Sequence, residues 1–365
     1  MSFSNQEDAM IVAAIHPIDF ILARAHGRYR RLGAPEQLID LARADSIREF
    51  VRAAGGPGEM DTCADLENWL ARDLAFELLR FARSLEEPGR AFMEWMALAT
   101  RLEDFKTRVR SRNAKLREDQ IAPHLVLASA LTDGAADLRE ARGPWGAGFN
   151  GIDPTEFLAT RRDRWPTAEE PSSTVRWELE LDRAFLLGLH DRARRLPTDD
   201  WELVWPLVRQ ETDLFHLRVA FGLPPEAAGA DDIAWREALH LPGSAIGLGA
   251  FKALLTSATH PTSAEQALRR VLGPASEELG AGPVHEGSLS MAEIERRAWL
   301  RFRQLAVRAF RLDPMSLGAL AGYVVLRRFA IADQTQLAEG LRLGLSPATR
   351  RARLLQRSTR EARHV

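Results

Sequence analysis

Apolar residues recur at steps of three and four over long stretches of this sequence, and this spacing limits the possible folds. One stripe runs through residues 66–81, a second through 181–189 and a third through 317–331. Such spacing places the apolar side chains on one face of an amphipathic helix. No run of alternating β-branched and polar residues stands out. The sequence therefore predicts an all-α protein.

The helical stretches fall into a pattern that recurs three times. Each copy has a long helix, a short turn and a second long helix that ends in arginine. The turns contain Glu87–Pro88, Pro197–Thr198 and Asp313–Pro314, where proline ends one helix or begins the next. The expected helix pairs are 65–84 with 89–112, 177–195 with 199–221, and 293–311 with 314–343.

Three copies of this size predict three similar helical domains rather than a solenoid of short repeats. A long connection rich in glycine and proline, from Asp133 to Pro171, precedes the second copy. Shorter apolar units, at 34–55 and 252–273, precede the first and third copies. The expected domain boundaries are 1–132, 133–240 and 241–365.

Charge and cysteine content exclude several classes of function. Lys and Arg total 49 against 51 Asp and Glu, so the chain lacks the basic excess of a dedicated nucleic-acid binder. The single cysteine, Cys63, excludes an internal disulfide and a cysteine-based zinc site. The longest uncharged stretch, 238–251, is shorter than the roughly 20 apolar residues of a membrane-spanning helix. We expect a soluble, cytoplasmic chain that does not cross a membrane by itself.

Acidic and histidine pairs suggest metal chemistry, and each has a simpler interpretation. His190–Asp191 resembles a pair that holds metal in some phosphohydrolases, but no other histidine stands at a recognisable ligand spacing. We expect a surface histidine at a helix end. Asp199–Asp200 and Asp231–Asp232 resemble magnesium-binding pairs, yet neither continues to a third carboxylate. Asp199–Asp200 stands at an expected helix start, where carboxylates cap the helix and favour its dipole.

No motif for catalysis or cofactor binding emerges. Gly243, Gly247 and Gly249 follow no strand and precede no Gly-Lys-Ser/Thr, so a loop or a close helix contact is favoured over a phosphate loop. The segment from Arg350 to Arg363 has six arginines against Glu361 and is either a solvated terminal helix or a contact for anions. We predict no catalytic, cofactor-binding or metal-binding residue.

The two ends and the middle of the chain resemble one known family. The matching segments are 23–32, which opens with Ala-Arg-Ala-His-Gly-Arg, then 177–185, 211–218, 241–243 and 323–354. Together they are similar to the C-type subunit of A/V-type rotary ATPases, the counterpart of the d-type subunit of V-ATPases. His216 stands where the family usually has asparagine.

The resemblance implies three similar helical domains around a pseudo-threefold axis, which form a funnel. It implies a non-catalytic central-stalk adaptor without cofactors, on the cytoplasmic face of the membrane. Such an adaptor joins the D-type and F-type subunits of the shaft to the proteolipid ring, and it serves proton or sodium transport. No nucleic acid is implied, and the membrane is met only through the complex.

The arginines that end the repeats are candidates to line the funnel or to meet acidic partners. Pairing with the helix C-terminal dipole explains them equally well. Two other functions stay open: a helical-repeat scaffold of the same fold outside a rotary ATPase, and an all-α metal-dependent hydrolase that uses His190 and Asp191. The candidate arginines are Arg108, Arg110, Arg112, Arg218 and Arg342.

Overall fold

The computed structural model describes residues 17–32, 35–57, 60–121, 125–126, 171–221, 230–256 and 291–354. Within these ranges the chain forms helices and no strands, which confirms the all-α prediction. The expected connection from residue 133 to 170 and most of the expected short unit at 252–273 lie outside the described residues.

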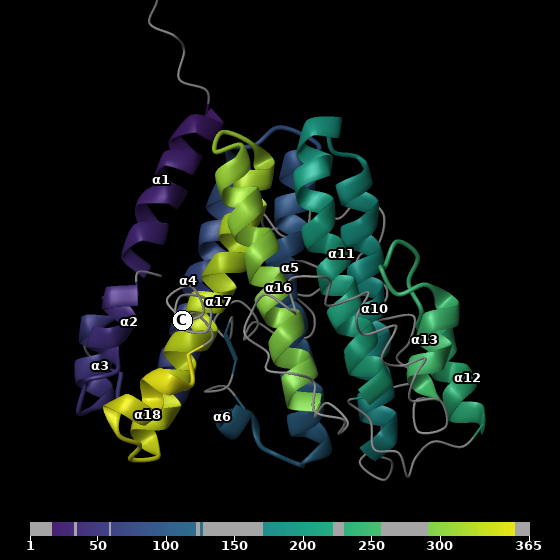
Figure 1. Ribbon diagram of the computed structural model, residues 1–365. Helices are drawn as coiled ribbons and strands as arrows, with labels where there is room; N and C mark the ends of the chain where they lie inside the picture. The colour runs from purple at the N-terminus through teal and green to yellow at the C-terminus, as the bar shows by residue number, and fades with distance from the viewer. Residues whose placement is uncertain are drawn as a thin grey trace, which may run out of the picture.

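Six long helices form three antiparallel hairpins whose turns lie at the same end of the molecule (Figure 1). The predicted helix pairs and their turns are confirmed, with starts and ends shifted by a few residues. The bounds are α4 (Cys63–Arg83) with α5 (Gly89–Asn113), α10 (Pro171–Arg194) with α11 (Thr198–Phe221), and α16 (Met291–Leu312) with α17 (Leu317–Arg342).

Local capping explains where several of these helices begin. The Thr62 side chain accepts a hydrogen bond from the backbone of Asp65 at the start of α4, and Ser316 accepts one from Ala319 at the start of α17. Each side chain pairs with a backbone donor that the helix itself leaves unpaired. The shorter helices are α1 (Pro17–Leu32), α2 (Pro35–Leu41), α3 (Ile47–Ala53), α6 (Glu118–Ile121), α12 (Ala230–Ala238), α13 (Leu248–Leu255) and α18 (Pro347–Ala352).

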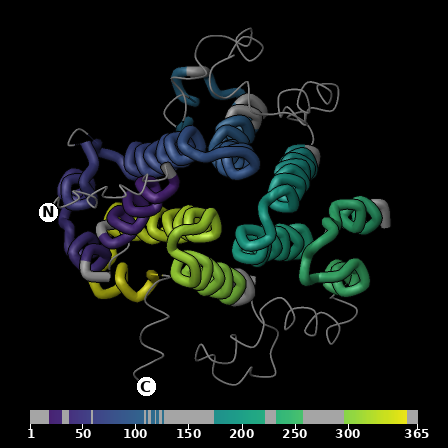
Figure 2. The backbone as a smooth tube through the Cα atoms, turned by 90° about the horizontal axis from the view of Figure 1, so that it is seen from above, coloured from purple at the N-terminus to yellow at the C-terminus, as the bar shows by residue number. Residues whose placement is uncertain are grey.

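Each hairpin touches the other two, as the view from above shows (Figure 2). Helix α5 packs on α10, α11 packs on both α16 and α17, and α17 packs on α4. One apolar core runs through all three hairpins and includes the fully buried rings of Trp95, Phe302 and Tyr323. The three hairpins therefore form one packed unit around a shared core.

Helix α17 contacts α1, α2, α3, α4, α11, α16 and α18. A second apolar cluster joins α2, α3 and the start of α4 to the end of α17, and it includes Phe50, Leu66 and Leu337. Arg350 of α18 adds a buried hydrogen bond at 2.9 Å from its guanidinium to the carbonyl oxygen of Ala44. The N-terminal short helices are thus held against the last hairpin of the chain.

The first two hairpins approach each other closely at Gly188 of α10. A Cβ atom there would lie 2.0 Å from the ring of Trp95 on α5, so only glycine fits. The Trp95 indole donates a hydrogen bond to the Phe185 carbonyl oxygen at 2.8 Å, and the Arg192 guanidinium lies 3.7 Å from the centre of an indole ring. Because Gly188 has no side chain, α5 and α10 approach closely, and the Trp95 indole fills the space between them.

Candidate functional site

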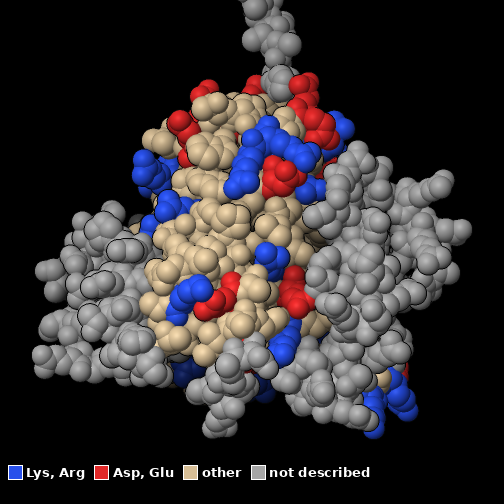
Figure 3. All heavy atoms as spheres, turned by 90° about the vertical axis from the view of Figure 1, so that its right-hand side faces the viewer, with Lys and Arg blue, Asp and Glu red and all other residues tan. Residues whose placement is uncertain are grey.

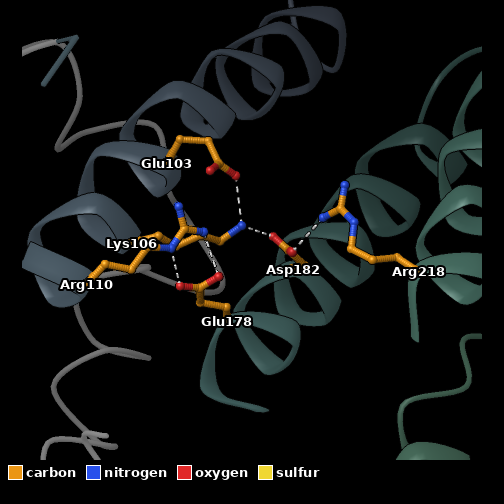
Figure 4. Close-up of polar contacts among 6 residues, drawn as sticks. All are labelled: Glu103, Lys106, Arg110, Glu178, Asp182 and Arg218. Carbon is orange, nitrogen blue, oxygen red and sulfur yellow. Dashed lines mark hydrogen bonds and ion pairs between the residues drawn. The ribbon is translucent and has the colours of Figure 1, made fainter. Parts of the chain in front are cut away.

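Among the described residues, a cluster of six charged side chains joins α5, α10 and α11 between two hairpins (Figure 4). Lys106 of α5 is buried, and its ammonium group contacts both Glu103 (2.8 Å) and Asp182 of α10. Arg218 of α11 reaches the other oxygen of Asp182 at 3.2 Å. One carboxylate therefore receives a cation from each side.

Arg110 and Glu178 form a second bridge between α5 and α10. The guanidinium donates two hydrogen bonds, at 2.5 and 2.6 Å, one to each oxygen of the carboxylate. Hydrogen bonding to Glu178 raises the pKa of Arg110 above its usual value. This two-pronged geometry is the strongest that an arginine makes with a carboxylate, so it fixes the relative position of the two helices.

The burial of Asp182 raises its pKa, and the positive charges of Lys106 and Arg218 oppose that rise. The six side chains drawn in Figure 4 carry three positive and three negative charges, so the cluster is neutral as a whole. A balanced set of ion pairs with Lys106, Asp182 and Glu178 at its largely buried centre positions helices. It supplies no activated nucleophile and no vacant anion site.

The structure places three of the predicted arginines in contacts within the chain. Arg110 and Arg218 belong to the cluster just described, and Arg342 pairs with Glu339 at 2.8 Å. The side chains of Arg108 and Arg112 lie outside the described residues. Sequence inspection missed the intramolecular partners because they stand 68 and 36 residues away from Arg110 and Arg218.

The expectation of a surface histidine at position 190 is wrong. His190 is buried, and its Nε2 lies 2.7 Å from the hydroxyl of Thr212 and its ring against Trp205. Asp191 turns outward and pairs with Arg195 at 2.5 Å. Burial lowers the pKa of His190 to about 4. The two residues of the pair diverge, which does not favour a shared metal site.

The acidic pairs make structural contacts. Asp200 accepts a hydrogen bond at 2.9 Å from the backbone of Leu317, so it caps α17 across the hairpin contact rather than its own helix. Asp232 is buried between Arg236 (2.7 Å) and Arg176 (3.0 Å). The side chain of Asp231 lies outside the described residues. Within the described part of the chain, no group of three potential metal ligands comes together.

A polar node formed by His216, Asp213 and Ser244 holds the segment between α12 and α13 on α11. The Ser244 hydroxyl donates to Asp213 at 2.5 Å, and the same Asp213 oxygen accepts from the backbone of Ala245 at 2.8 Å. His216 Nε2 accepts from the backbone of Leu241 at 3.0 Å. His216 Nδ1 therefore carries the proton of the neutral ring and donates to the Ser244 oxygen, which lies 3.0 Å away.

This node contains serine, histidine and aspartate, but its hydrogen bonds do not suit catalysis. A general base must present a lone pair to the hydroxyl that it deprotonates. The lone pair of His216 is occupied by the Leu241 backbone, and burial lowers the pKa of His216 to about 3. Burial also raises the pKa of Asp213. The node therefore fastens a loop to a helix.

The expectation of a loop or a close helix contact at the three glycines is confirmed at Gly243. This residue lies in a loop with a positive φ of 86° and packs against Trp205. A Cβ atom at Gly243 would lie 2.8 Å from the Trp205 ring. Gly247 precedes α13 as its N-cap residue, and Gly249 lies inside that helix. These positions fit a loop and a helix contact.

The N-terminal segment that resembles the family makes a buried charge network. Arg28 of α1 contacts Asp73 at 2.6 Å and Glu77 at 3.1 Å on α4. Arg327 of α17 contacts the same Asp73 oxygen, and the hydroxyl of Tyr323 donates to Glu77 at 2.8 Å. Burial raises the pKa of Glu77. The network fastens α1 to the first and third hairpins, so Arg28 has a structural role.

The ATP synthase (C/AC39) subunit family matches residues 21–353 of this chain. This range begins within α1 and ends just after α18, so it takes in most of α1 and all the other helices described above. The chain belongs to the ATP synthase (C/AC39) subunit family. No curated protein matches the chain.

Membership of the ATP synthase (C/AC39) subunit family confirms the resemblance to the C-type and d-type subunits of rotary ATPases. It fits a subunit of a V/A-type ATPase and implies a place in a rotary ATPase complex. The family is one of structural subunits that are not known to be catalytic. Across the described residues, no helix combines the length and hydropathy needed to span a bilayer.

Proposed function

We propose that this protein is the non-catalytic central-stalk adaptor of a rotary V/A-type ATPase. It joins the shaft of the nucleotide-binding motor to the membrane proteolipid ring and so serves proton or sodium transport. The family match across residues 21–353 carries the proposal. The partners are the D-type and F-type subunits of the shaft and the proteolipid ring, and the protein sits on the cytoplasmic face of the membrane.

The packing of the hairpins supports a role in the transmission of torque. Each hairpin contacts the other two, and polar bridges join hairpins in addition to the apolar core. Such a body resists twisting because a relative rotation of any hairpin would break ion pairs or force side chains out of close packing. An adaptor of this kind needs stiffness and no reactive group.

The proposal includes the arrangement expected from the sequence. Each hairpin, with the chain around it, corresponds to one of three domains at 1–132, 133–240 and 241–365. These domains surround a pseudo-threefold axis and form a funnel for the foot of the shaft. The three hairpin contacts and the common position of the three turns support this arrangement (Figures 1 and 2).

The test is a pull-down from detergent-solubilised native membranes with a tagged copy of the full chain, followed by quantitative mass spectrometry. Recovery of the nucleotide-binding subunits, the shaft subunits and the proteolipid in fixed ratio is the expected result. The tag fused to an unrelated helical protein is the control. If the rotary subunits are intact in the same membranes but none is recovered, the proposal is wrong and the scaffold alternative stands.

A further inference from the structure

Helices α1 and α4 lie side by side on the outside of the molecule. Arg28 of α1 contacts both Asp73 and Glu77 of α4, at 2.6 and 3.1 Å. Helix α1 begins, and α4 ends, at the end of the molecule where the hairpin turns lie, so the two helices run in opposite directions (Figure 1). The residues of α1 that precede Arg28 therefore lie beside the residues of α4 that follow Glu77.

Two phenylalanines project from the outer side of this helix pair. The side chain of Phe20 on α1 is 67% exposed, and that of Phe76 on α4 is 45% exposed. A Cβ atom added at Gly27, on the outer side of α1, would meet nothing within 4 Å. Single exposed apolar residues are common on protein surfaces, but aromatic rings that stand next to arginines are typical of protein interfaces.

Three exposed arginines stand next to these rings. Arg24 lies one turn along α1 from Phe20, and Arg80 and Arg83 lie one and two turns along α4 from Phe76. Residues at this spacing share a face of a helix. The side chains of the three arginines make no hydrogen bond or ion pair with any described residue. We call Phe20, Arg24, Phe76, Arg80 and Arg83 the α1–α4 face.

The carboxylates between α1 and α4 are engaged by other cations. Asp73 pairs with Arg28 and with Arg327, and Glu77 is buried and pairs with Arg28. These two acids and two arginines balance, so the α1–α4 face keeps a positive charge from its own arginines. On the face in Figure 3, which lies on the other side of the molecule from α1, basic and acidic side chains form neighbouring groups of opposite sign.

Local effects explain only a part of this charge. Arg80 and Arg83 stand in the last turn of α4, where cations favour the helix dipole. Glu86 and Glu87 follow in the turn, but among the described residues neither forms an ion pair with these arginines. Neither effect involves Arg24, which lies in the middle of α1, or the two exposed rings.

We propose that the α1–α4 face binds an acidic α-helix of a partner protein, in which large apolar side chains stand next to carboxylates on one side. The face extends over about 10 Å along α4, or two turns of helix. A partner helix that lies along two neighbouring helices contacts both of them. The two rings supply apolar anchors, and the arginines pair with carboxylates. The inference goes beyond the adaptor role, because it depends on this surface alone.

An anionic membrane fits the α1–α4 face less well. Basic helices that bind a bilayer carry large apolar residues along the whole margin of the basic face. The exposed side of α4 instead continues to Asp65, which is exposed and lies about 17 Å from Phe76 along the helix on the same side. A flat anionic surface along α4 would meet this negative charge, whereas a partner helix of a few turns need not reach it.

The first test uses the full chain and two fluorescent helical peptides. One peptide carries leucines at positions i, i+7 and i+14 and glutamates at i+4, i+11 and i+15 on an alanine and glutamine background. The other has the same composition and the same leucines, with the glutamates moved to the opposite side of the helix. Fluorescence anisotropy should show about tenfold tighter binding of the first peptide, because its leucines and glutamates meet the rings and arginines together. Added salt should reduce this preference.

Two variants test the binding surface. Arg24→Glu/Arg80→Glu/Arg83→Glu should abolish the preference for the first peptide, and the milder triple change to glutamine should weaken it. Phe20→Ser/Phe76→Ser should weaken the binding of the first peptide several-fold, because the apolar anchors are lost. All five side chains are exposed, so circular dichroism should show that the variants are folded.

Matched controls make the same changes elsewhere on the surface. Arg52→Glu/Arg308→Glu/Arg353→Glu reverses three exposed arginines on α3, on α16 and after α18. Leu116→Ser/Leu343→Ser removes two leucines that are 41% and 58% exposed. Both controls should bind the first peptide as the parent does.

Three results would overturn the inference. These are equal binding of both peptides, an equal loss of binding in the controls, or preserved binding in the variants of the α1–α4 face. Vesicles that contain phosphatidylglycerol supply the remaining comparison. If the vesicles bind the parent through this face while the first peptide does not, the face recognises lipid and the helix proposal is wrong. None of these outcomes depends on whether rotary subunits are recovered in the pull-down.

Discussion

The second hairpin is held on its two sides by different chemistry. Toward α5, the contact combines the close approach of Gly188 to Trp95 with charged pairs around Lys106 and Arg110. Toward the α12–α13 segment, it uses the neutral ring of His216 and backbone hydrogen bonds. Both sides include an ion pair, since Asp232 of α12 also contacts Arg176 of α10, but only the second side depends on uncharged histidine. A change of pH should therefore separate the two contacts.

The largest expected effect is at the close contact on the α5 side. Gly188→Ala places a Cβ atom 2.0 Å from the Trp95 ring, so the indole or the helix must move. We expect the free energy of unfolding to fall by about 3 kcal/mol, measured by urea denaturation. The matched control is Gly27→Ala in α1, where a Cβ atom meets open space. The control should be slightly more stable because alanine favours helix, and equal losses would disprove the close contact.

The second largest effect is expected from acid, which should weaken the contacts of the two buried histidines on α10 and α11. Burial lowers the pKa of His190 from 6.5 to about 4 and that of His216 to about 3. The unfolded chain therefore binds protons more readily than the folded chain, and stability falls as pH drops through 6.5 toward these values. Between pH 7 and pH 5, His190 alone should account for a loss of about 2 kcal/mol.

Denaturation at both pH values in His190→Gln checks this loss. The glutamine amide can still donate to Thr212, which accepts from His190 in the parent. The variant should show a smaller difference in stability between the two pH values. The His26→Gln variant, on α1, should keep the parent's difference. An unchanged slope in His190→Gln would contradict the assignment of the acid sensitivity to this buried ring.

The third largest loss of stability is expected from removal of the buried ammonium group of Lys106. Lys106→Met leaves Asp182 with Arg218 alone, and we expect a loss of about 1.5 kcal/mol because the largely buried carboxylate loses one of its two cations and keeps the other. The double variant Lys106→Met/Asp182→Asn should recover part of that loss, since the uncompensated charge is also gone. Double-mutant analysis of thermal or urea unfolding measures the coupling, and full additivity would show that the pair is independent.

The smallest effect is expected at the exposed edge of the same contact. Arg110→Gln removes the bidentate bridge to Glu178, and because the guanidinium side chain is half exposed we expect a loss of about 0.5 kcal/mol. The loss should shrink as salt rises, because salt already screens the pair in the parent protein. A loss that does not change with ionic strength would mean that packing of the arginine stem, rather than its charge, holds the edge.

Sequence reasoning found the helices and missed their polar connections. Apolar spacing and the prolines at Pro197 and Pro314 set the hairpins because both signals act within a few residues. A capping role was predicted for Asp200 at the start of its own helix, but Asp200 caps α17, which begins 117 residues later. His216 was noted only as a departure from asparagine, because Ser244 and the Leu241 backbone approach it only in the fold.

The charged residues of the helices could be predicted from the sequence only in part. Helix α16 begins with Glu293 and Glu295 and then carries six arginines, but periodicity alone does not tell which of these arginines face outward and which face acidic neighbours. The buried positions at Ala298, Phe302 and Ala306 settle the orientation. Conversely, Arg110 and Arg218 looked available for partners and prove to be engaged within the chain. A helix pattern reports local geometry, whereas the pairing of long side chains depends on distant segments.

The central place of α17 has a consequence for synthesis of the chain. Helices α1, α2 and α3 all pack against α17, which is made more than two hundred residues after them. At typical rates of translation, their apolar side chains must wait for tens of seconds before that partner leaves the ribosome. Leu22, Leu38 and Phe50 are fully buried in the finished molecule, but during that interval they lack the part of their packing that α17 supplies. The nascent protein therefore exposes an apolar surface near its N-terminus to which chaperones can bind, and the folding of that region is completed last.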